Sequence, residues 1–186
     1  MQKNVLTIII TLFIFSKGLA QTPNGYYITL NNDTIKVSFI IPTNIHEEIN
    51  LNRHGTYYDL LKIKRTLKPK KVKEIFFIDS LKSVRMISNG HFFLRLNMNG
   101  KVNLYYYWDY DKDSHGLDFE EVYHQEFLLK RDIEDSFTKV SFLNNKNLCK
   151  YFADCQIVVA HINKYKYRWD NIDLIVKEYN AECGAQ

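Results

Sequence analysis

Alternating apolar and polar positions run through most of the chain between residues 25 and 142 and predict β-strands there. The first two runs are separated by Asn31, Asn32 and Asp33, residue types that tolerate the positive φ of a tight turn, so an opening hairpin is expected. Residues 45–58 have no clean period and predict a loop or a short helix. The predicted strands lie at residues 26–30, 34–41, 75–78 and 83–87, in a hairpin at 91–108, and at 122–131.

Asn99 and Gly100 mark the turn of the hairpin at 91–108. A two-residue turn would place Leu96 opposite Asn103 and mix apolar with polar positions on one face. A three-residue loop ending at Gly100 keeps the apolar face intact and gives the glycine a left-handed position. The expected pairs are Leu96 with Val102, Leu94 with Leu104, and Phe92 with Tyr106.

Apolar residues recur at i, i+3, i+4 and i+7 beyond residue 146, a spacing typical of amphipathic helices. One helix is predicted over 148–162 and a second over 169–183, with Asp170 as the N-cap of the second. Strands followed by helices indicate an α+β fold, an antiparallel β-sheet built from hairpins with two C-terminal amphipathic helices packed on it. The β-rich part is expected at 25–142 and the helical part at 146–183.

The N-terminus has the layout of a cleavable signal peptide. Lys3 precedes an apolar run at 5–15, and the small residues Gly18 and Ala20 stand at the −3 and −1 positions of the expected cut. We therefore assign residues 1–20 to a signal peptide and 21–186 to a single α+β domain. The apolar run is too short to span ~30 Å of hydrocarbon, so no transmembrane anchor is expected.

Removal of the signal peptide on export would lower the net charge of the chain. The full chain has a formal charge of +4, and removal of Lys3 and Lys17 with the signal peptide leaves +2. A balance this mild gives no reason to expect a nucleic-acid partner. The lysine-rich stretch at 62–73 predicts either a solvated edge strand or a contact with anionic envelope glycolipid.

Several short motifs occur along the chain: Ala20-Gln21, residues 25–30 with 33–35, residues 93–96 before Asn99-Gly100, Leu104-Tyr105, residues 152–155 and residues 175–180. In these motifs the chain resembles small exported proteins of unknown function from Bacteroidota-type bacteria. The resemblance implies export and an α+β fold, and it implies no activity.

One acidic segment has the spacing of a calcium loop. Asp109, Asp111, Asp113 and Glu120 stand at positions 1, 3, 5 and 12, where EF-hand loops carry oxygen ligands. Ser114 occupies the position of the usual turn glycine, and a strand precedes the segment where an EF-hand has a helix. A solvated acidic hairpin loop is the alternative, and a transition-metal site using His115 is a third.

The aromatic run before that segment has two faces. Tyr106 and Trp108 share the apolar face with Leu104 and are expected in the core. Tyr105 and Tyr107 are expected on the opposite face, as a binding platform for glycan or peptide or covered by a helix.

Three cysteines leave several pairings open in an oxidising compartment. Cys149 and Cys155 are six residues apart on one predicted helix, about 9 Å along its axis, which is too far for a bridge. Antiparallel helices would bring Cys155 and Cys183 together, and this is the predicted disulfide. A Cys149–Cys183 bridge and three free thiols are the alternatives.

These features predict an exported, non-catalytic binding or interaction module of the cell envelope, periplasmic or extracellular, whose partner is an envelope protein or a glycan. A glycan-directed enzyme and a calcium-stabilised structural accessory protein are the alternatives. An enzyme should show a pocket with converging carboxylates or histidines, and a binding module should show an exposed aromatic or basic face.

Overall fold

The computed structural model describes residues 23–112, 121–164 and 167–184. The predicted signal peptide therefore lies outside the described residues. The strands are β1 (Gly25–Thr29), β2 (Thr34–Phe39), β3 (Gly55–Tyr58), β4 (Lys64–Leu67), β5 (Val72–Asp79), β6 (Lys82–Ser88), β7 (Phe93–Met98), β8 (Asn103–Lys112), β9 (Glu121–Lys130) and β10 (Thr138–Lys139). The helices are α2 (Ile45–Arg53), α3 (Asn145–Tyr151), α4 (Gln156–Asn163) and α5 (Ile172–Glu182), with short 3₁₀ turns at Pro69–Lys71, Val140–Phe142 and Trp169–Asn171.

The ten strands form one antiparallel sheet in the order β10-β9-β8-β7-β6-β5-β1-β2-β3-β4. The α+β prediction is confirmed. The opening hairpin is also as predicted, because Asn32 takes a φ of 70° in the turn between β1 and β2. None of the described helices is long and apolar enough to span a bilayer.

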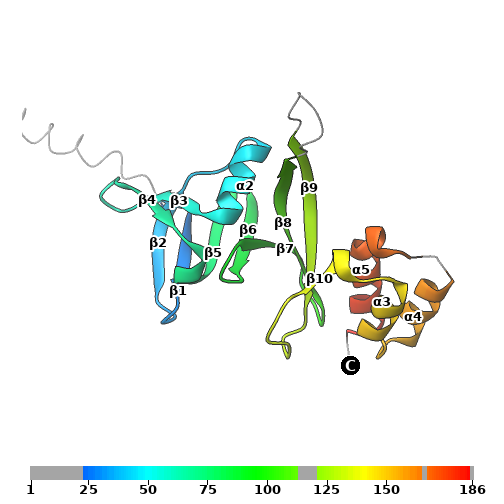
Figure 1. Ribbon diagram of the computed structural model, residues 1–186. Helices are drawn as coiled ribbons and strands as arrows, with labels where there is room; N and C mark the ends of the chain where they lie inside the picture. The colour runs from blue at the N-terminus through cyan, green and yellow to red at the C-terminus, as the bar shows by residue number, and fades with distance from the viewer. Residues whose placement is uncertain (1–22, 113–120, 165–166, 185–186) are drawn as a thin grey trace, which may run out of the picture.

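Helices pack on the sheet at two places (Figure 1). α2 contributes Leu51 to a core whose other members come from β2, β4, β5, β6 and β7. The three C-terminal helices lie together beside β9 and β10, away from β1 to β4. Their core includes Phe152, Ile175 and Tyr179, packed against Leu104 and Leu129 of the sheet.

The predicted register of the hairpin at 91–108 is wrong. Leu96 pairs with Tyr105 rather than Val102, and a bulge separates Leu96 from Met98, which pairs with Leu104. The cause is a contact with α5. The Asn180 amide accepts a hydrogen bond from Val102 N (3.0 Å) and donates one to Val102 O (2.9 Å). Val102 is thereby held by the helix, and the loop is longer than the turn chemistry suggested.

The helix predicted over 148–162 is divided into α3 and α4. Asp154 lies between them. Its carboxylate accepts a hydrogen bond from the Tyr179 hydroxyl on α5 (2.5 Å) and forms an ion pair with Lys101 (3.3 Å). The apolar spacing continues through the break, because Leu148 and Phe152 before it and Val158 and Ile162 after it belong to the same core. For this reason the pattern alone did not reveal the break.

Cys155 and Cys183 form the predicted disulfide, with their Cα atoms 5.9 Å apart. Cys155 immediately precedes α4 and Cys183 immediately follows α5, so the bridge joins the start of one helix to the end of the other. Cys149 is free, and its thiol donates to the Asn163 side-chain oxygen at 3.4 Å.

The turn between β5 and β6 offers a stability prediction. Ser80 and Leu81 have φ values of 46° and 74°, and the Leu81 side chain is 98% exposed. A left-handed conformation disfavours a residue with a Cβ, and this leucine gains no packing in return. We expect Leu81→Gly to raise the free energy of unfolding by about 0.5–1 kcal/mol in urea denaturation. Leu81→Ala retains the Cβ and should have little effect; a less stable glycine variant would contradict the argument.

Candidate functional site

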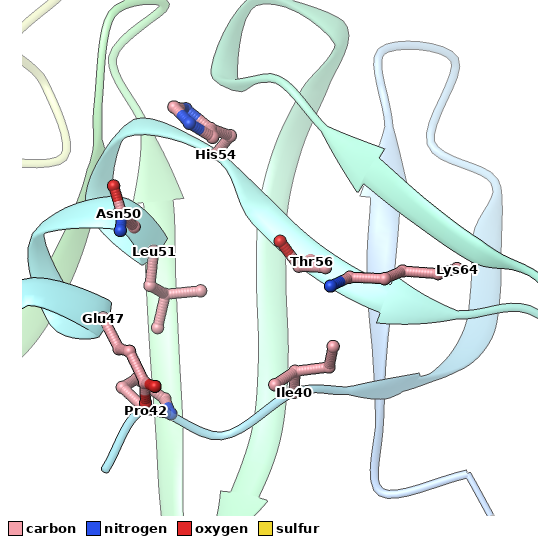
Figure 2. A pocket seen from close by; sticks show the side chains of 8 residues that line it. All are labelled: Ile40, Pro42, Glu47, Asn50, Leu51, His54, Thr56 and Lys64. Carbon is pink, nitrogen blue, oxygen red and sulfur yellow. The ribbon is translucent and has the colours of Figure 1, made fainter. Parts of the chain in front are cut away.

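A cleft of about 210 Å³ lies between α2 and the β3–β4 hairpin (Figure 2). Its apolar side is formed by Leu51 and by the segment that follows β2. Its polar side includes His54, which caps the end of α2 just before β3, and Lys64, the first residue of β4. The lining residues are Ile40, Pro42, Glu47, Asn50, Leu51, His54, Thr56 and Lys64.

Among the described residues that line this cleft, Glu47 is the only carboxylate, and it serves the start of α2. Asn44 caps the helix by accepting from Glu47 N (3.0 Å), and the Glu47 carboxylate accepts in return from Thr43 N (2.7 Å) and the Thr43 hydroxyl (3.0 Å). The hydrogen bond from the Thr43 backbone is the largest influence on Glu47 and holds the pKa of this carboxyl below its usual range. The cleft therefore contains an ionised capping group and a lysine, an arrangement suited to holding a small polar molecule.

A second cavity, of about 150 Å³, lies beside α2 near β8. Arg53 lines it, pairs with Asp109 at 2.8 Å and lies 5.2 Å from the centre of the Tyr110 ring. Burial acts to lower the pKa of Arg53, but the hydrogen bonds to Asp109 and Tyr110 outweigh it and the pKa is raised. Asp109 Oδ1 also accepts from Tyr110 N at 3.0 Å.

This pairing bears on the predicted calcium loop. Asp109 and Asp111 belong to β8, whereas Asp113 and Glu120 lie outside the described residues. Among the residues that the structure describes, no group of three or more His, Cys, Asp or Glu side chains is arranged to hold a metal ion. Calcium binding at Asp109, Asp111, Asp113 and Glu120 and its alternative, a solvated acidic loop, both stay predictions.

Calcium binding is tested by melting temperature. Since a guanidinium already occupies one oxygen of Asp109 and repels a second cation, we expect millimolar Ca²⁺ to leave the melting temperature unchanged. A rise in the wild-type protein that Asp111→Ala removes would establish the calcium site and contradict this expectation. Mg²⁺ at equal ionic strength is the control for general salt effects.

The expectation for the aromatic run needs correction. Tyr105 and Tyr107 are 4% and 8% exposed, so they do not form a surface platform. Tyr107 stacks on Phe92 with ring centres 4.6 Å apart, and Tyr105 meets Phe137 edge-on at 5.3 Å. Of the two alternatives, the tyrosines are covered, and the covering residues come from segments outside the helices. Tyr106 and Trp108, expected in the core, are only half-buried.

Glu48 on α2, whose side chain is 12% exposed, was not predicted as a site residue from the sequence. Glu48 Oε1 lies 3.0 Å from Arg95 on β7, and burial raises the pKa of Glu48 although Arg95 opposes the rise. Glu48 and Asn52 are four residues apart on α2, so they share a face of the helix. With a helix assigned to residues 45–53, this spacing would have placed Glu48 and Asn52 on the same helix face. Glu48 does not line either cavity described above.

The β3–β4 hairpin and the residues after it form an exposed surface, which we call the basic hairpin (residues 58–73). Residues 60–73 contain seven Lys or Arg and no Asp or Glu. Every one of these cations is exposed, and β4 is the last strand of the sheet, as the edge-strand prediction for the lysine-rich stretch proposed. Leu60 and Leu61 are 79% and 78% exposed at the tip.

Comparisons with protein-family models, with curated proteins and with solved structures found no match to this chain.

Proposed function

We propose that this protein is an exported, non-catalytic binding module of the cell envelope and that the basic hairpin is its contact surface. The observation that carries the proposal is the concentration of exposed cations at 62–73 beside an exposed pair of leucines. Exposed apolar side chains rimmed by charge are typical of surfaces that meet a partner.

Two features support export. Residues 1–20 have the charge, length and terminal small residues of a cleavable signal peptide, and the Cys155–Cys183 disulfide suits an oxidising compartment. We propose a mature N-terminus at Gln21. Intact-mass analysis of the exported protein tests this, and a mass that retains residues 1–20 would contradict it.

The alternative of a glycan-directed enzyme has less support. Glycoside cleavage uses two carboxyl groups that face one substrate. Glu47 in the larger cleft is paired with Thr43, and Glu48 on the same helix is paired with Arg95 outside that cleft. The geometry of the described residues therefore supports a binding role better than this reaction.

Charge reversal tests the proposed contact surface. Lys68, Lys70 and Lys71 are exposed, and their replacement together by Glu should move most of the protein from the envelope fraction to the soluble exported fraction. The matched control replaces Lys146, Lys150 and Lys164, which are exposed on or next to α3 and α4, and so makes the same change in net charge on another surface. Equal retention of both triple variants would contradict the proposal.

A further inference from the structure

We propose that the partner of the basic hairpin is an anionic lipid surface, into which Leu60 and Leu61 insert while the flanking lysines contact the headgroups. This inference rests on the proposed function, because it names the partner of the same surface. Three observations carry it: the construction of the hairpin tip, the exposure of its leucines and the charge around them.

Asp59 builds the tip. Its Oδ1 accepts hydrogen bonds from Leu61 N (3.0 Å) and Ile63 N (2.9 Å). Its backbone N–H donates to Ile63 O, and its backbone carbonyl accepts from Lys62 N. Arg65 donates to the other carboxylate oxygen at 3.1 Å. The hydrogen bond from the Ile63 backbone is the largest influence on Asp59 and lowers the pKa of its carboxyl. The ionised Asp59 side chain thus holds the loop through hydrogen bonds to Leu61, Ile63 and Arg65.

This construction holds the leucines away from the protein. The loop backbone is closed by Asp59, so Leu60 and Leu61 extend outward without covering a core, and Ile63 beside them is 45% exposed. Because the loop is already ordered, insertion of these side chains into another phase costs little further backbone entropy. Placing two adjacent leucines in water has no benefit for folding, whereas transfer into hydrocarbon is favourable.

The shape of the hairpin favours lipid over a protein partner. The β3–β4 hairpin projects from the edge of the sheet, on the side of the molecule away from the C-terminal helices (Figure 1). A projecting apolar tip needs a matching cavity in a protein partner, but a bilayer interface accepts it without shape complementarity.

The charge on the hairpin complements anionic headgroups. Lys62 and Lys64 lie on either side of Ile63, and Lys68, Lys70 and Lys71 follow within one short segment. Clustered lysines next to a membrane-facing apolar segment attract anionic lipid, and this attraction weakens with salt. Apolar insertion and electrostatic attraction are each weak alone, and together they give stable but reversible binding.

Vesicle sedimentation tests the inference. The probe is vesicles of phosphatidylglycerol in phosphatidylcholine, with pure phosphatidylcholine for comparison, and the protein is taken from the exported fraction. We expect binding to the anionic vesicles that falls as salt is raised. Leu60→Ser combined with Leu61→Ser should weaken that binding at least about tenfold. Leu81→Ser removes a leucine that is even more exposed, from the β5–β6 turn, and should leave binding unchanged.

The set of outcomes distinguishes failure of the lipid partner from failure of the proposed function. Absence of vesicle binding, with envelope retention still dependent on Lys68, Lys70 and Lys71, would overturn the lipid partner and leave the binding role intact. Equal vesicle affinity of the double-serine variant and the wild type would overturn insertion. If the wild type does not bind vesicles and its envelope retention does not depend on these lysines, both the inference and the proposed function are overturned. Circular dichroism of each variant verifies that its fold is unchanged.

Discussion

Replacement of Cys155 and Cys183 by Ser is expected to lower the free energy of unfolding by about 3–4 kcal/mol, because the bridge closes a loop of 28 residues and restricts the unfolded chain. The C-terminal helices should also unfold at a lower urea concentration, since Cys155 precedes α4 and Cys183 follows α5. Urea denaturation followed by circular dichroism measures both the midpoint and the slope of the transition.

Cys149→Ser is the matched control for that experiment. This cysteine is free and only partly buried, so its replacement should change the free energy of unfolding by less than about 1 kcal/mol. A double-serine variant as stable as the wild type would contradict a stabilising role for the bridge. Peptide mapping under non-reducing conditions should recover Cys155 and Cys183 in one linked pair, and a Cys149–Cys183 pair would refute the assignment.

The disulfide and the general architecture were predictable because they depend on local periodicity. Cys155 continues the apolar stripe of one predicted helix and Cys183 that of the other, so antiparallel packing was enough to bring them together. The register of the β7–β8 hairpin depended instead on Asn180, which lies 78 positions beyond Val102 in the chain. A pattern of neighbouring residues contains no information about such a contact.

The burial of Tyr105 and Tyr107 also depended on contacts that the local sequence pattern does not contain. Alternation correctly placed Tyr105 and Tyr107 on one face and Tyr106 and Trp108 on the other. Phe92 and Phe137 cover Tyr107 and Tyr105 through contacts that arise from the tertiary fold. On the other face the C-terminal helices bury Leu104 but leave Tyr106 and Trp108 half-buried. The expectation was therefore reversed, although the alternation was right.

The basic hairpin was visible in the sequence as a run of lysines, but the tip was not. No sequence pattern marks Asp59 as a turn residue or as a partner of Arg65, because its role depends on the positions of Leu61, Ile63 and Arg65 in the folded loop. The cleft beside α2 was equally hidden, because no motif among its lining residues marks it.

Asn52→Ala is expected to lower the free energy of unfolding by about 3 kcal/mol. Asn52 is 1% exposed, donates to Phe93 O (3.0 Å) and accepts from Trp108 N (2.9 Å). The register of Arg95 with Tyr106 would bring Phe93 opposite Trp108 if the ladder continued. The amide of Asn52 thus replaces the hydrogen bonds between β7 and β8 at this point and anchors α2 to the sheet.

Alanine leaves the buried Phe93 carbonyl and the part-buried Trp108 N–H without this partner, which costs more than the loss of a surface hydrogen bond. Asn50→Ala is the matched control, because Asn50 lies on the same helix, is exposed and lines the cleft. Its effect on the free energy of unfolding should stay below about 0.5 kcal/mol. Urea denaturation of both variants decides the matter: equal losses would show that the amide bridge between β7 and β8 does not stabilise the fold, and that α2 is held by Leu51 and the apolar contacts around it.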